Sequence, residues 1–317
     1  IPPEYRSDVT YGPNVKALSV ALYSEGVMSN DRIAAFLNAA GNGELGLSAG
    51  SIYGFCKLFS DRAQGSLAHL EERLLAQAVV LTDATVVSVN GKQNYIRNFS
   101  VDDMVIYHAM KEKTVAAMKS LPFLRNFSGI LAHDHETALY HFGMDHAECN
   151  VHIIRYLKKN TEDTGSQWPG QMAALLCEMN RKRKVRIEQE QGAFSPEEIT
   201  AYEKSYQELI RKGREENKNT KHHYAQKEEK TLLNRMEKYR HNHLLFLHDF
   251  AVPFDNNMSE RDLRKAKNRQ KMAGGFRKES GNEMYCAILS IIESLKRRKM
   301  EILENIKRLF MGTPAIF

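Results

Sequence analysis

The spacing of apolar residues divides the chain into a helical first quarter and a strand-rich middle. Up to about residue 77, apolar positions recur every three or four residues, which is the spacing of one helix face. Two short helices are predicted at residues 29–37 and 48–55. Ser29 or Asn30 can cap the first of them, and Ser48 can cap the second. A glycine-rich turn joins them. The pair resembles a helix-turn-helix, and the alternative is a helical hairpin that only packs.

The pattern changes to strands after residue 77. An apolar run at residues 78–87 leads to Asn90-Gly91, which is the strongest short signal of a hairpin. Residues 93–101 and 104–110 continue as strands, so we expect an antiparallel meander of three strands. Further elements are then predicted: a helix at 114–121, a strand at 129–134, a helix at 136–142, a short strand near Ala147 and a helix from about Asn150.

The second half of the chain lacks strand signals. Residues 161–248 are charged and favour helices, including one at 202–212 that Gly213 is predicted to interrupt. A basic helix around Glu260 should end at Gly274-Gly275, and a long last helix is predicted at 285–307. We therefore expect four segments: a helical N-terminal region (1–77), the first part of a catalytic α/β domain (78–160), a helical insertion (161–248) and the C-terminal part of that domain (249–317).

Three isolated carboxylates stand out against this pattern. Asp83 interrupts the first apolar strand, Asp134 ends the fourth strand, and Glu260 opens the basic helix. A lone buried carboxylate is costly unless something positive meets it. Carboxylate oxygens are the ligands of hard divalent cations, so three of them brought together could hold such ions.

The order of the elements is that of a ribonuclease-H-like mixed sheet with a long helical insertion. Strands one and four lie side by side in such a sheet, so Asp83 and Asp134 can converge while the late helix delivers Glu260. Three acids can seat two Mg²⁺ ions roughly 3.5–4 Å apart. Each acid also has a structural alternative: a helix cap for Asp134, a capping box for Glu260 and an ion pair for Asp83.

Charge and cysteine content narrow the possible partners. The formal net charge is +6, and the cations are concentrated in the second half, with 16 Lys/Arg against 11 Asp/Glu at residues 181–240 and 14 against 9 at 241–317. This favours a polyanionic partner, although a solvated helix face is the common alternative. The four cysteines form no CxxC pair, and no apolar stretch approaches the roughly 18 residues that span a bilayer, so we expect a cytoplasmic protein without a membrane partner. Candidate DNA-backbone contacts follow Glu260: Arg264, Lys267, Arg269, Lys271 and Arg277.

Several ordered motifs carry a family resemblance. Residues 255–264 (DNNMSERDLR) and 271–276 (KMAGGF), together with residues 11–18, 81–85 and 149–155, resemble DDE transposases of the insertion sequence sixty-six family. The resemblance implies that Asp83, Asp134 and Glu260 form a metal-binding catalytic triad near His152. It implies Mg²⁺ as cofactor, with Mn²⁺ able to substitute, and cleavage and strand transfer of DNA at the element ends by a homo-oligomer associated with the bacterial nucleoid.

The sequence departs from the family pattern at three places. It reads Asp83-Ala84-Thr85 where Asp-Glu-Thr is common, and Asp134 is flanked by His133 and His135 rather than lying in Asp-Gly-Tyr. The family's N-terminal cysteine-rich zinc-binding segment is missing from these residues. Two rival functions are therefore kept: a catalytically silent DNA-binding protein derived from a transposase, and another metal-dependent nuclease that uses the two histidines with Asp134. Cys149-x-x-His152 could be half of a zinc site, but it lacks a second pair.

Overall fold

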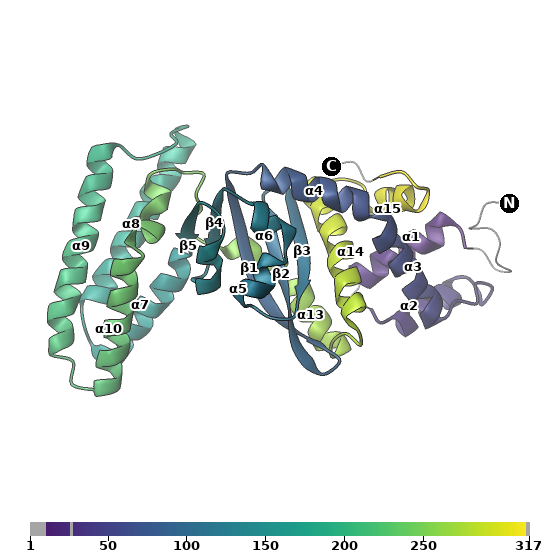
Figure 1. Ribbon diagram of the computed structural model, residues 1–317, viewed down its shortest axis with the longest axis horizontal. Helices are drawn as coiled ribbons and strands as arrows, with labels where there is room; N and C mark the ends of the chain where they lie inside the picture. The colour runs from purple at the N-terminus through teal and green to yellow at the C-terminus, as the bar shows by residue number, and fades with distance from the viewer. Residues whose placement is uncertain (1–10, 26–27, 315–317) are drawn as a thin grey trace. The chain divides into compact units, whose positions relative to one another are not determined.

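A computed structural model describes residues 11–25 and 28–314 of the chain, which combines helices and strands in an α/β fold (Figure 1). The chain divides into two compact units. Unit 1 is made of the described residues within Ile1–Phe127 and Met258–Phe317, and unit 2 is Ser128–Asn257. Helices predominate in both. No described helix is both long enough and apolar enough to cross a membrane.

An antiparallel meander forms the sheet of unit 1. Its strands are β1 (Val79–Val89), β2 (Lys92–Val101) and β3 (Met104–Met110), and β2 pairs with both others. Asn90 and Gly91 join β1 to β2 with φ angles of 49° and 73°. A two-residue turn with both φ angles positive matches the twist of paired strands, which is why Asn-Gly favours it. The predicted meander is confirmed.

The first four helices of unit 1 lie in the predicted helical quarter. They are α1 (Pro13–Ser24), α2 (Asn30–Ala40), α3 (Ala49–Arg62) and α4 (Gln64–Leu75). Ser29 caps α2 by accepting a hydrogen bond from the backbone of Arg32, and Ser48 forms a capping box with Ser51 at the start of α3. Ser48 is confirmed as a cap, and of the two candidates for α2 the cap is Ser29, while Asn30 is the first helical residue. Such caps satisfy backbone N–H groups that have no partner inside the helix.

The C-terminal helices of unit 1 are α12 (Asn257–Asp262), α13 (Arg264–Ala273), α14 (Glu279–Arg297) and α15 (Ile302–Phe310). The prediction of one long last helix at 285–307 is wrong. The chain turns at Lys299, where φ is 54°, and α15 then runs separately to bury its own apolar face against α1 and α3. Helix α14 packs on β3, where Ser290 and Ser294 accept hydrogen bonds from backbone N–H groups of the strand.

Unit 2 contains two parallel strands and a set of long helices (Figure 1). The strands are β4 (Ile130–His133) and β5 (Asp145–Glu148), joined by the 3₁₀ helix η2 (Thr137–His141) in place of the predicted α-helix. The helices follow: α7 (Asn150–Thr164), α8 (Trp168–Glu188), α9 (Pro196–Lys218), α10 (His223–Lys238), α11 (Arg240–Leu244) and η3 (Leu245–Leu247).

Two further helices differ in extent from their predictions for physical reasons. Helix α9 continues through Gly213 without interruption. A Cβ atom at this position would lie 2.7 Å from both Trp168 of α8 and Leu233 of α10, so the glycine is needed for close packing of the three helices. The helix predicted at 114–121 is present as the shorter α5 (Val115–Lys119), and an unpredicted short helix, α6 (Pro122–Asn126), follows it. Pro122 begins the second because its ring fits the first turn of a helix but not the interior.

Candidate active site

Asp83 lies in the middle of β1 and is half-buried. Its carboxylate Oδ1 accepts a hydrogen bond of 2.6 Å from the backbone N–H of Ala84, and its own N–H donates to the side-chain oxygen of Asn98 at 3.0 Å. Asn98 is the partner of Asp83 in the register of β1 with β2. The side chain of Asn98, on the neighbouring strand β2, therefore fixes the backbone of Asp83.

The same asparagine anchors the helix that carries Glu260. Asn98 is fully buried, accepts a hydrogen bond from the Ser259 hydroxyl at 2.7 Å and donates one to the Ser259 carbonyl at 2.9 Å. Glu260 is the next residue and is half-buried. Within unit 1, the backbones that carry Asp83 and Glu260 thus meet at one side chain.

A second set of contacts holds α12 from its other end. Asp262 accepts hydrogen bonds from the Ser100 hydroxyl at 2.6 Å and from the Arg297 guanidinium at 2.5 Å, and its carbonyl accepts one from the Tyr107 hydroxyl at 3.2 Å. Sequence reasoning missed these residues and Asn98. The signal that could have revealed Asn98 is a polar residue inside an otherwise strand-like segment, since asparagine is depleted in strands.

Asp134 follows directly after β4 in unit 2. Its side chain is 27% exposed, and its Oδ1 atom is buried yet accepts no hydrogen bond from the described residues. Within the unit, the Nδ1 atom of the His152 imidazole lies 3.7 Å from that oxygen. This separation is longer than a hydrogen bond, so the buried oxygen retains capacity for another ligand.

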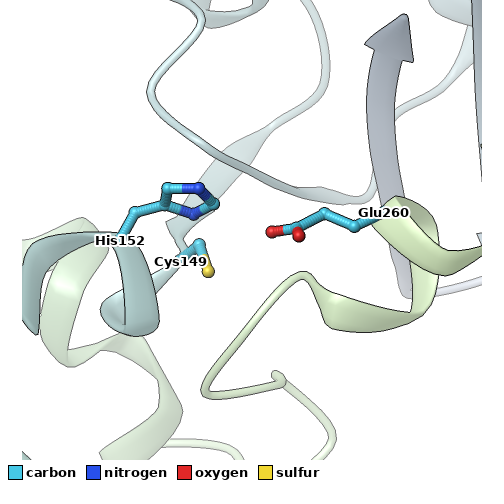
Figure 2. A group of neighbouring side chains, drawn as sticks. All are labelled: Cys149, His152 and Glu260. Carbon is cyan, nitrogen blue, oxygen red and sulfur yellow. The ribbon is translucent and has the colours of Figure 1, made fainter. Parts of the chain in front are cut away.

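Cys149 and His152 lie at the start of α7, and Figure 2 shows their side chains together with that of Glu260 on α12. The Cys149 sulfur accepts a hydrogen bond from the backbone of Asn256 at 3.3 Å. Burial raises the pKa of the Cys149 thiol to about 11. A bound metal ion displaces the proton of a coordinating thiol, so this pKa does not decide the half zinc site, which stays a prediction.

The two histidines beside Asp134 have other partners. The Nε2 atom of His133 lies 3.2 Å from the Nδ1 of His146, and its Nδ1 accepts a hydrogen bond from the backbone of Glu136 at 3.3 Å. The Nδ1 of His135 lies 2.6 Å from a carboxylate oxygen of Glu148. These contacts argue against a nuclease site built from the two imidazoles and Asp134.

The predicted acids are thus divided between the two units. Asp83 and Glu260 belong to unit 1, where Asn98 links their backbones, and Asp134 lies beside His152 in unit 2. The sequence model of the transposase IS66 family matches residues 9–284. The chain belongs to the IS66 family of transposases. No curated protein matches it. Membership gives the chain a role in transposition and makes DNA its partner.

The cations proposed to meet DNA in this transposase differ in exposure. Arg264, Lys267 and Lys271 are exposed and lie on one face of α13, because residues three and four apart share a helix face. Arg277 is exposed after the glycine turn. Arg269 is buried: its guanidinium lies 4.3 Å from the centre of the Tyr23 ring and donates to the carbonyl of Met28 at 2.9 Å. The Arg269 guanidinium therefore contacts groups inside unit 1 and does not lie on the exposed face of α13.

Proposed function

We propose that this chain cleaves DNA at the ends of an insertion sequence and joins them to target DNA, with Asp83, Asp134 and Glu260 as Mg²⁺ ligands. Family membership is the observation that carries the proposal. It is supported by the placement of the acids on β1, directly after β4 and on α12. A ribonuclease-H-like sheet, in which β1 and β4 are neighbours, would bring the three carboxylates to one site.

The donor set fits a hard divalent ion. Carboxylate oxygens suit Mg²⁺, and Mn²⁺ accepts the same ligands. The buried Oδ1 of Asp134, which accepts no hydrogen bond from the described residues, is the kind of atom that an ion would satisfy. When bound, a pair of such ions would activate the attacking oxygen and stabilise the leaving oxygen.

The chain's own residues orient these ligands. Asn98 fixes the backbones of Asp83 and Ser259, and the Asp262–Arg297 pair holds α12 in place. Ligands held in advance need little reorganisation during the reaction, which is why supporting hydrogen bonds matter for rate. His152 would contact Asp134 from the side and restrict its rotamers.

DNA would be held by cations close to the catalytic helix. Arg264, Lys267 and Lys271 line the exposed face of α13, which directly follows α12, and Arg277 follows α13. Such residues neutralise phosphates without reading sequence. The α2–α3 pair is proposed as a helix-turn-helix for the element ends, with two or more copies of the chain acting together on two ends in the nucleoid.

The test is strand cleavage and joining on supercoiled plasmid and element-end DNA with Mg²⁺ or Mn²⁺. Asp83→Asn should lower the rate at least about 100-fold, because it removes a charged ligand while keeping the shape of the side chain. Asp61→Asn is the matched control, since Asp61 is an exposed acid on α3 that pairs with the exposed Lys57 one turn away. Metal-dependent cleavage retained by Asp83→Asn would refute the proposal. Folding and DNA binding should be unchanged in both variants.

A further inference from the structure

Glu148, the last residue of β5, is a buried carboxylate that the proposed chemistry does not use. Its side chain is inaccessible to solvent, yet four side chains bind its two oxygens. Oε1 meets the Nδ1 of His135 at 2.6 Å and the hydroxyl of Tyr140, and Oε2 meets the guanidinium of Arg235 at 2.7 Å and the Nε2 of His243 at 3.1 Å. Because both oxygens of this buried carboxylate are bound by two side chains each, the hydrogen bonds hold every side chain of the cluster in one position.

The charge state of Glu148 agrees with this geometry. Burial raises the pKa of its carboxyl, but the hydrogen bonds from His135 and His243 and the charge of Arg235 outweigh burial and hold the pKa well below its usual range. The carboxylate is therefore ionised at neutral pH, and a hydrogen bond to an ionised acceptor is a strong one.

His135 is the member of this cluster with the strained backbone. Its φ angle is +61°, in the left-handed region that costs residues other than glycine free energy. Such a conformation persists only where the surroundings impose it. The imidazole is held on one side by Glu148 and on another by the ring of Tyr239, whose centroid is 4.7 Å away in an edge-on contact. The side chain thus anchors the backbone.

Asp134 immediately precedes this anchored residue. It is the first residue beyond β4 and lies in a bend, so the strand holds it from one side and His135 from the other. We propose that Glu148 is a positioning residue for Asp134: by binding His135 it maintains the left-handed turn that sets the direction of the Asp134 carboxylate. This inference rests on the proposed role of Asp134 as a metal ligand.

The bond between Glu148 and His135 is best removed by substituting His135. Glu148→Ala would leave the largely buried Arg235 and the buried His243 without their partner and would destabilise the unit, whereas His135→Ala leaves Glu148 bound to Arg235 and His243. Tyr140→Phe is the matched control, because it deletes another bond to the same Oε1 atom without altering the residue next to Asp134. His135→Gly tests the backbone, because glycine adopts a positive φ without strain.

Two readouts decide the inference. In His135→Ala, the Mn²⁺ concentration for half-maximal plasmid cleavage should rise about 10- to 100-fold, which is the range expected when a residue that orients a metal ligand is lost. It should recover partly in His135→Gly and stay within about twofold of the original in Tyr140→Phe. Amide hydrogen exchange at residues 134–136, measured without metal, should be faster in His135→Ala than in the unaltered chain and should be unchanged in Tyr140→Phe.

Equal cleavage midpoints and equal exchange in His135→Ala and Tyr140→Phe would overturn the positioning role. The two proposals fail separately. If the unaltered chain shows no metal-dependent cleavage, the proposed function fails. The exchange comparison then decides the positioning role of Glu148 by itself, because it needs neither metal nor DNA.

Discussion

Helices α9 and α13 are both rich in charge, but their cations have different surroundings. On α9, lysine and arginine side chains lie close to acids: Lys218 is 2.8 Å from Glu215, Lys212 is 3.6 Å from Glu216, and Arg214 pairs with Glu237 of α10. On α13, the exposed residues Arg264, Lys267 and Lys271 form no ion pair within the described part of the chain.

The comparison teaches that the number of charges in a segment does not identify a binding surface. Cations already paired with carboxylates have part of their field cancelled, and a phosphate must compete with the carboxylate for them. Cations that share a face and have no acidic neighbour keep their attraction for a polyanion. We therefore keep DNA contact by α13 as the proposal, and α9 serves in packing unit 2.

The largest expected effect on DNA binding follows neutralisation of the exposed face of α13. In the triple variant Arg264→Ala, Lys267→Ala, Lys271→Ala, duplex binding should weaken more than about tenfold, because three phosphate contacts are lost. The slope of log affinity against log salt concentration should become shallower by up to about 2.7, at about 0.9 per contact. Fluorescence anisotropy over a salt series measures both. An unchanged slope would remove α13 from the DNA interface.

The buried cation of α13 should behave in the opposite way. Arg269→Ala removes the contacts with the rings of Tyr23 and Tyr285 and the hydrogen bond to Met28, so the free energy of unfolding should fall by about 2–3 kcal/mol. Chemical denaturation measures this loss. The salt dependence of DNA binding should not change. A shallower slope without a loss of stability would place Arg269 on DNA instead.

A smaller loss of stability is expected in the bundle that contains α9. Gly213→Ala should lower the free energy of unfolding by about 1–2 kcal/mol, because crowding against Trp168 and Leu233 exceeds the gain in helix propensity. Gly170→Ala in α8 is the matched control: a Cβ there meets nothing within 4 Å, so it should stabilise by up to about 1 kcal/mol. The same sign for both variants would contradict the packing role of Gly213.

The smallest effect is predicted for a paired surface cation. Lys218→Ala breaks only the exposed ion pair with Glu215, which is worth about 0.5 kcal/mol or less. DNA affinity and its salt slope should both stay unchanged. A change in slope of about 0.9, the value expected for one phosphate contact, would show that pairing with a carboxylate does not distinguish the cations of α9 from those of α13.

The parts of the fold that sequence predicted well depend on neighbours in the chain. The Asn90-Gly91 turn and the serine caps of α2 and α3 are confirmed, because each is decided by hydrogen bonds and φ angles within four residues. Ile288 and Ile292 of α14 are fully buried side by side for a similar local reason, since residues four apart share a helix face. For the candidate site, the sequence singled out Asp83, Asp134 and Glu260 as unusual carboxylates, and their catalytic role stays a prediction.

The remaining features depend on residues that are distant in the chain. The sequence by itself determined the local elements, the family and the excess of positive charge in the second half. Only the tertiary structure decided that Gly213 is a packing contact inside α9, that Arg269 is buried between tyrosines, and that Asn98 joins the strand of Asp83 to the helix of Glu260. The physical reason is that turns and caps are closed by adjacent backbone groups. Burial and hydrogen bonding across more than 100 residues exist only once separate elements have packed.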